Sequence, residues 1–443
     1  MNVVDNFAKN HYSWIQQYIQ LDCLSTDINL QVPGAELTEA GDRNTSLLVH
    51  EYIHYLQNFA TYWGTWVCTA LAFGYLKVGA SSATSAETYQ LPLKKENVTN
   101  APLRGGLGLL ELVKARLGQS DSTVPVSGGS LRPITVSIGS DIVALSNGLL
   151  NVQVGMKVIR ESMAHTGTSL YLGRSDDELH QFNGLISKKT STTAAFVTAE
   201  EYWIVFEYFY GRGKYTNVAR GVFDLMQYAL CTLRPDRTVG RFFRFLTASG
   251  TETSLPALVW AFQVTPTEQH ISADAQQRTL KHCQDALDVC NKHQDNHALF
   301  EFALAIINYT VEGITASNGG RVFDPADDFH DFDYWREKIR RYGSGLIKFR
   351  DRSMINGTED HCKKMHTPFT YLLSVGVVLE KLVGNNILQC PILHEFNICR
   401  VGYRDGPGCH SNPFTVINPD PAGDQCVFRN GFLLLGMQDR IQF

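Results

Sequence analysis

The sequence predicts an α+β protein that is predominantly helical, and two patterns carry this prediction. From about residue 156 to 385, apolar residues recur at spacings of three and four, which is the period of an amphipathic helix. Between residues 120 and 155, β-branched residues alternate with polar residues and glycines, which is typical of short strands or hairpins. A chain of 443 residues can bury a large core. We therefore expect a small sheet followed by a large helical region.

The segments before residue 80 are predicted from local patterns. Residues 5–20 carry aromatic and apolar side chains at helical spacing, which predicts a short amphipathic helix. Residues 28–32 alternate in polarity and end at a Pro-Gly pair, which predicts a strand. No Pro or Gly interrupts residues 45–63, and the polar residues at 42–46 supply N-cap candidates. A helix is therefore expected there.

Later helices are expected wherever apolar residues recur three and four positions apart. The expected ranges are 109–117 (after a glycine-rich turn at 105–108), 156–171, 198–210, 218–232, 239–248, 270–292, 297–314, 334–350 and 369–384.

The most informative feature of the chain is the sequence His-Glu-x-x-His at His50, Glu51 and His54. Residues four apart lie on one face of a helix, so His50 and His54 can offer two imidazole nitrogens to one metal ion. Glu51 lies one residue along, within reach of a water molecule held by that metal. The alternative is a helix whose two histidines bind nothing.

This segment resembles the active-site helix of the zincin metallopeptidases, and its continuation through Tyr55, Leu56 and Gln57 resembles bacterial members of that group. The resemblance implies a zincin-like core, one catalytic Zn2+ and Glu51 as general base. It covers this helix rather than the whole chain, so it implies a reaction class and not a substrate. In the zincin fold an edge strand aligns the substrate backbone by β-addition, and residues 28–32 would suit that role.

A catalytic zinc site usually has three protein ligands and one open position. Position 60 is Ala, so the third His of the metzincin pattern is absent. The thermolysin-like group takes a Glu from a later helix, and residues 158–165 resemble its Glu-x-x-Ala helix, which implies that Glu161 is the third ligand. The long separation from His54 requires an insertion, and the Gly-, Ser- and Thr-rich residues at about 78–150 have that character.

Other residues are further candidates for the site. His165 lies one helical turn after Glu161 and is predicted to be catalytic, either by orienting a ligand or by stabilising the oxyanion of the transition state. It could also replace Glu161 as the third ligand or be an ordinary buried histidine. The alternative carboxylates for the third ligand are Glu200, Glu201 and Glu207.

Three regions are expected along the chain. Residues 1–215 would form the zincin-like catalytic region with its insertion, residues 216–385 a helical region, and residues 386–443 a Cys-rich, loop-rich C-terminal region. The candidate ligands of a second, structural zinc ion are Cys390, Cys399, Cys409 and Cys426. Their spacing lacks Cys-x-x-Cys pairs, so disulfides and free thiols are open alternatives.

The composition limits the classes of partner and the location. Lys and Arg number 39 and Asp and Glu number 44, so the net charge is −5, which argues against a nucleic-acid partner. The N-terminus lacks the pattern of a signal peptide, and ten scattered cysteines favour a reducing compartment, so a cytoplasmic location is expected. Residues 59–76 are uncharged but contain Thr and Gly, so we expect buried helices there and no membrane span.

The sequence therefore predicts a zinc-dependent metallopeptidase that acts on a protein or peptide substrate. Glu51 would take a proton from the attacking water and pass it to the leaving amine. Two alternatives are open: a non-catalytic binding or scaffold protein with a structural metal site, and a zinc hydrolase of a non-peptide amide. The helical region after residue 215 could bind a regulatory protein partner.

Overall fold

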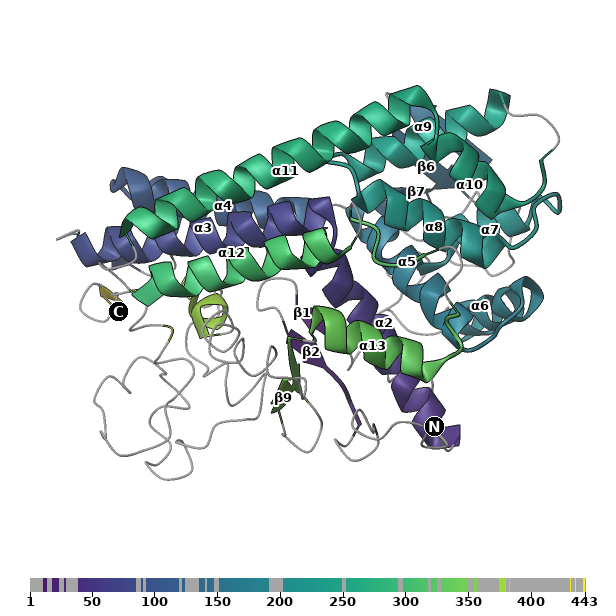
Figure 1. Cartoon of the computed structure of the whole chain (residues 1–443), viewed down its shortest axis with the longest axis horizontal. Coiled ribbons are helices and arrows are strands. Elements are labelled where there is room, and N and C mark those ends of the chain that lie inside the picture. The colour runs from purple at the N-terminus through teal and green to yellow at the C-terminus, as the bar shows by residue number, and fades with distance from the viewer. Residues whose placement is uncertain are drawn as a thin grey trace.

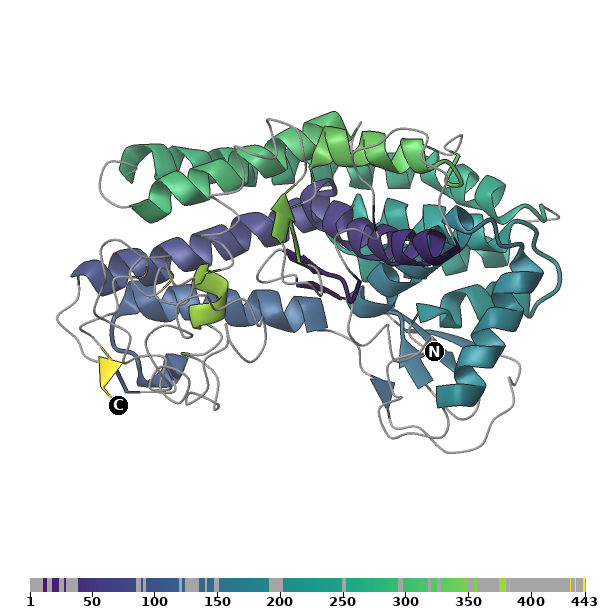
Figure 2. The same cartoon turned by 90° about the horizontal axis from the view of Figure 1, so that it is seen from below.

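The protein is described by a computed structural model (Figures 1 and 2). The described residues are 11–13, 18–23, 28, 39–84, 89–90, 93–118, 122–123, 135–139, 142–146, 151–190, 202–248, 252–293, 298–317, 320–324, 328–343, 345–348, 354–356, 374–379, 382, 431, 435 and 441–442.

A first group of long helices lies around α3 (Tyr62–Thr84). Its other members are α4 (Ala101–Gly118), α11 (Pro266–His293) and α12 (Ala298–Ala316), which run side by side with α3 in Figure 1. Helix α3 is apolar around most of its circumference, so it is stable only if neighbouring helices cover it on several sides. The packing of α4, α11 and α12 against α3 provides this cover.

A second group of helices surrounds α8 (Val218–Leu230), whose side chains are buried along most of its length. The other members are α5 (Met156–Tyr171), α6 (Asp176–Thr190), α7 (Ile204–Tyr210), α9 (Pro235–Ala248) and α10 (Leu255–Gln263). Aromatic rings of α8 and α9 pack edge to face on Phe262 of α10, an arrangement that aromatic quadrupoles favour. Phe209 of α7 packs on Phe243 of α9 with its ring tilted by 45°.

Helix α2 (Glu39–Phe59) joins the two groups, because it packs against both α3 and α5 (Figure 1). It ends where the chain turns directly into α3, and Gly64 makes this turn possible, because a side chain there would collide with the backbone oxygens of Gln57 and Asn58. One continuous hydrophobic core contains residues of α2, α3, α5, α8 and α12. The motif on α2 therefore lies between two large packed bodies.

Small sheets complete the fold. One has the strand order β1 (His11–Ser13), β2 (Tyr18–Gln20), β8 (Leu346–Lys348) and β9 (Met354–Asn356), with β2 and β8 parallel and the outer pairs antiparallel. A second, fully antiparallel sheet has the order β4 (Ser122–Thr123), β7 (Asn151–Gln153), β6 (Ile142–Ser146) and β5 (Thr135–Gly139). A two-stranded parallel pair consists of β3 (Tyr89–Gln90) and β10 (Ile441–Gln442).

The fold class predicted from the sequence is confirmed at the level of a mostly helical chain with small sheets, and the sheet expected at 120–155 is present. Among the described residues, no helix has both the length and the apolar character needed to cross a membrane. The strand expected at 28–32 and the four candidate zinc cysteines of the tail lie outside the described residues, apart from Ile28. The division of the chain at 215 and 385 stays a prediction.

Four expectations about single elements are wrong. The N-cap expected among residues 42–46 lies inside α2, which begins earlier, at Glu39. Of the residues 5–20 for which a helix was expected, the described ones, 11–13 and 18–20, form β1 and β2, because β2 is fixed by pairing with β8. The glycines at 105–108 lie inside α4 and not in a turn, because Gly106 lets α4 approach α3 closely. The helix expected at 334–350 is α13 (Phe332–Tyr342), which ends at Gly343 with φ +71°, and the chain then enters β8.

The distance between α2 and α5 depends on Gly167. A Cβ atom at this position would lie 2.6 Å from Ile53 Cδ1 on α2 and 2.7 Å from Phe223 Cε2 on α8. We expect Gly167→Ala to lower the free energy of unfolding by about 1–3 kcal/mol through overpacking. The measurement is chemical denaturation of the two proteins, and a variant as stable as the wild type would contradict this account of the α2–α5 contact.

Gly184 provides the matched control, because it is also helical but a Cβ atom there meets nothing within 4 Å. Gly184→Ala should raise the free energy of unfolding by up to about 1 kcal/mol, since Ala is the better helix former.

Candidate metal centre

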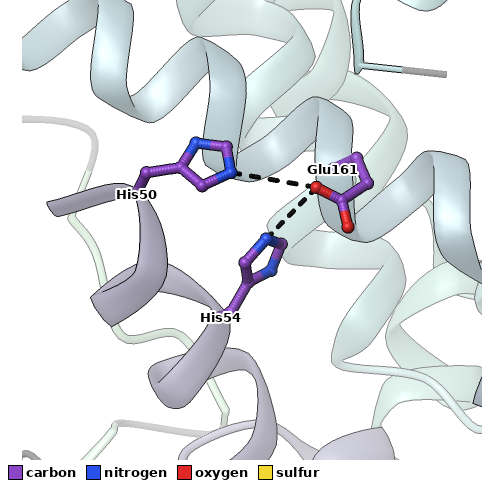
Figure 3. Close-up of side chains that lie close together, drawn as sticks. All are labelled: His50, His54 and Glu161. Atoms are coloured by element: carbon purple, nitrogen blue, oxygen red, sulfur yellow. Dashed lines mark ion pairs between the residues drawn. The ribbon is translucent and has the colours of Figure 1, made fainter. Parts of the chain in front are cut away.

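Three side chains converge between α2 and α5. His50 and His54 project from one face of α2, and Glu161 projects from α5 toward them (Figure 3). Glu161 Oε2 lies 3.2 Å from His54 Nε2 and 3.8 Å from His50 Nε2, and one ligand atom from each residue lies within 4.8 Å of the others. The two histidines are 3% and 4% exposed. The three residues could therefore hold one metal ion.

The proton on the His54 ring is positioned by its neighbours. Gln57 Nε2 donates a hydrogen bond of 3.0 Å to the backbone oxygen of Arg160, which fixes the orientation of the Gln57 amide. Gln57 Oε1 then lies 3.0 Å from His54 Nδ1 and can only accept, so His54 donates its Nδ1–H. In the neutral ring the lone pair is consequently on Nε2, which faces Glu161.

The same reasoning applies to His50. Thr168 Oγ1 uses its hydrogen to donate a bond of 2.7 Å to the backbone oxygen of Ala164, so it acts as an acceptor toward His50 Nδ1 at 3.3 Å. The Nε2 atom of a neutral His50 therefore also carries a lone pair directed at Glu161. Hydrogen bonds that fix ligand histidines in this way are typical of metal sites.

Glu161 Oε2 is buried and accepts no hydrogen bond of good geometry from any described residue. Two imidazole lone pairs and a carboxylate oxygen thus meet in a buried space, where they repel one another unless a cation lies among them. A His2Glu set with one open position is a common catalytic zinc arrangement. The donor atoms and their protonation therefore fit a zinc ion.

A proton is the other cation that these groups can bind. Burial disfavours a charged His54, but the neighbouring Glu161 outweighs burial and raises the pKa of His54. Burial likewise disfavours a charged Glu161, yet the adjacent His54 and His50 hold its pKa well below the usual range. Glu161 therefore favours a proton on His54 in the metal-free protein, and zinc binding would displace that proton.

Glu51 is 5% exposed and is close enough to His50, His54 and Glu161 to interact with all three electrostatically. Burial raises its pKa, which the nearby His50 and His54 partly offset, and the backbone N–H of Tyr12 donates a hydrogen bond to it. Tyr12 belongs to β1, so the first sheet touches the motif directly. The structure thus places a buried carboxylate beside the ligand set, as the sequence motif predicts.

The other predicted site residues lie in a neighbouring hydrogen-bonded group. His165 Nε2 lies 2.9 Å from Asn183 Oδ1, and Glu207 binds Asn183 and His180, so the described geometry brings neither His165 nor Glu207 into the ligand set of His50 and His54. Glu200 and Glu201 lie outside the described residues.

Sequence reasoning did not single out Tyr202, although its ring stacks on His50 with 5.9 Å between the ring centroids and 25° between the planes. It also missed Thr168 and Asn183. Their signal is weak, since hydroxyl and amide side chains on helices are common, and only the hydrogen-bonding partners give them a role.

The fixed Gln57 amide has a testable consequence for metal affinity. Gln57→Leu keeps the approximate size of the side chain but removes both the acceptor for His54 Nδ1 and the bond to Arg160. We expect the zinc dissociation constant to rise about 10- to 100-fold. Competition with a zinc-binding dye measures it, and Gln284→Leu on the exposed face of α11 is the control. Equal affinities in all three proteins would show that Gln57 does not orient His54.

No match was found when the chain was compared with the models of protein families, with curated proteins and with solved structures.

Proposed function

We propose that this protein is a zinc-dependent metallopeptidase with a zincin-like catalytic region in residues 1–215. The observation that carries the proposal is the convergence of His50, His54 and Glu161 from two packed helices, with the Nε2 atoms of both histidines facing Glu161 Oε2. Zinc held there would act as a Lewis acid on the scissile carbonyl and make a water molecule more acidic.

Glu51 has the chemistry of a general base in this reaction. A carboxylate beside the ligand set can take the proton of the attacking water and return it to the leaving amine. The backbone N–H of Tyr12 holds Glu51 in a fixed orientation, which keeps the acceptor oxygen in place during both transfers. The low exposure of Glu51 strengthens every electrostatic interaction it makes with the reacting groups.

The substrate that we propose is a protein or peptide. The support is the resemblance of the motif to zincins and the contact of β1 with the motif helix. Among the described strands β1 lies at the edge of its sheet, and an edge strand near such a helix can pair with an extended peptide. Residues 216–385 would support the site, because α8 packs along α5, the helix that carries Glu161. A regulatory protein partner for that region is part of the proposal.

A second candidate is a binding or scaffold protein with a structural metal site. The near-complete burial of His50, Glu51 and His54 favours it, because structural zinc sites are closed whereas catalytic ones keep an open position. The presence of Glu51 favours the enzyme, since a structural site has no use for an extra carboxylate that needs desolvation.

A peptide library separates the two candidates. The protein is stripped of metal with a chelator, reloaded with one equivalent of zinc, and incubated with a proteome-derived peptide mixture whose new N-termini are identified by mass spectrometry. The enzyme account predicts cleavage that appears only after reloading. Tight retention of zinc with no cleavage of any peptide would favour the structural site.

A further inference from the structure

A hydrogen-bonded chain runs from the neighbourhood of the candidate metal centre toward the surface of α6. His165 Nε2 lies 2.9 Å from Asn183 Oδ1, Asn183 Nδ2 donates a bond of 2.8 Å to Glu207 Oε1, and Glu207 Oε2 lies 2.7 Å from His180 Nδ1. The four residues come from α5, α6 and α7. His165, Asn183 and Glu207 are buried, so these hydrogen bonds belong to the interior of the protein.

This series of hydrogen bonds fixes the tautomer of the His165 ring. Because Glu207 can only accept as a carboxylate, the Asn183 amide must direct its nitrogen at Glu207 and its oxygen at His165. His165 therefore donates through Nε2–H. Burial lowers the pKa of His165 to about 3, against the opposing effect of the Asn183 hydrogen bond, so the ring is neutral at physiological pH. It is a neutral imidazole whose tautomer is set by Asn183.

The His165 ring belongs to a group of packed aromatic rings that reaches His50, a candidate ligand. Phe182 stacks on His165 with 6.3 Å between the centroids, and the Arg174 guanidinium lies 3.9 Å above the Phe182 ring. Tyr202 meets His165 edge to face at 6.4 Å and stacks on His50 at 5.9 Å. Tyr202 thus lies between the His165 ring, which is hydrogen-bonded to Asn183, and the imidazole of His50.

His50 needs this support more than His54 does. The Nδ1 atom of His54 has a 3.0 Å bond to an amide that is itself fixed, whereas Nδ1 of His50 has a 3.3 Å contact with the Thr168 hydroxyl. A hydrogen bond weakens as it lengthens, so the orientation of the His50 ring depends more on ring packing.

We propose that Tyr202 is a positioning residue for His50, held in place by the Asn183–His165 pair. This inference rests on the proposed function, because it assigns His50 the role of a ligand. The stacked face of the Tyr202 ring holds the plane of the His50 ring in its orientation. The phenol hydroxyl of Tyr202 is not required for this role. The ring of the tyrosine is therefore the feature that matters.

Cobalt provides the test, since Co2+ replaces zinc in such sites and its visible absorption reports ligand geometry. The variants are Tyr202→Phe, Tyr202→Leu and Asn183→Leu. The control is Tyr210→Phe, since Tyr210 lies on α7, the helix that carries Glu207. We expect Tyr202→Phe and Tyr210→Phe to keep the wild-type spectrum. Tyr202→Leu and Asn183→Leu should bind one cobalt per chain with shifted bands and a dissociation constant raised about 10-fold.

Cleavage of a peptide identified from the library gives a second readout. The same two Leu variants should lower kcat about 10-fold with little change in KM, since the support acts on the ligand and not on substrate binding. Thermal unfolding of each metal-free variant shows that it is folded, and Tyr202→Leu is the safer substitution because Tyr202 is only half-buried.

The outcomes separate this inference from the function on which it rests. A wild-type spectrum and kcat in folded Tyr202→Leu overturn the inference alone, and so does a Tyr202→Phe variant as impaired as Tyr202→Leu. A wild-type protein that binds no cobalt overturns the proposed function and the inference with it.

Discussion

Replacing Glu51 with Gln is expected to lower the rate of peptide hydrolysis by about 100- to 10,000-fold, which is the usual contribution of a general base. The amide has nearly the shape of the carboxylate but cannot accept a proton from water. Because Glu51 is not in the set of three ligands, the zinc content of the variant should equal that of the wild type. The measurements are kcat/KM on a cleaved library peptide and zinc per chain.

The control for this prediction is Glu111→Gln, since Glu111 lies on α4 and its side chain is 48% exposed. It should leave both the rate and the zinc content unchanged. A Glu51→Gln variant with full activity would contradict the assignment of the general base, while loss of zinc in that variant would show that Glu51 supports the ligands instead.

The second large effect is expected for Glu161→Ala. This substitution removes the only carboxylate of the ligand set in the described part of the chain, so the zinc dissociation constant should rise by more than about 100-fold, beyond the effect of losing an outer hydrogen bond. Zinc at about 100 times its dissociation constant should stabilise the wild type by about 2.7 kcal/mol and stabilise the variant far less.

Thermal unfolding with and without zinc measures this difference. The metal-free Glu161→Ala protein should remain folded, because the substitution removes a buried carboxylate whose desolvation is costly, and burial keeps His54 neutral once that carboxylate is gone. Glu111→Ala should respond to zinc as the wild type does. Equal zinc-dependent shifts of Tm in Glu161→Ala and the wild type would exclude Glu161 as a ligand.

The local part of the site could be predicted from the sequence because it depends on one helix. The spacing of His50 and His54 places both on one face of α2, and no distant contact is needed for that. Glu161 was reached through the resemblance of its surroundings to a known helix pattern. The long segment between His54 and Glu161 includes α3, α4 and a small sheet, so their proximity is a property of the packed fold.

The parts that sequence reasoning missed depend on contacts between remote segments. The helix expected near the N-terminus is replaced by β1 and β2 because β2 pairs with β8, more than three hundred positions later in the chain. The role of Tyr202 likewise follows from its position between His50 and His165, which are brought together by the packing of α2 and α5. Local periodicity does not contain this information.

The most direct test of the metal centre is the zinc content per chain by elemental mass spectrometry, for the wild type, His54→Ala and the control His270→Ala on the exposed face of α11. The proposed site predicts that the wild type and His270→Ala carry equal zinc and that His54→Ala carries one ion fewer. Zinc that remains in His54→Ala would belong to a second site. Equal zinc in all three proteins would show that His50, His54 and Glu161 do not bind the metal, and the peptidase function would be contradicted.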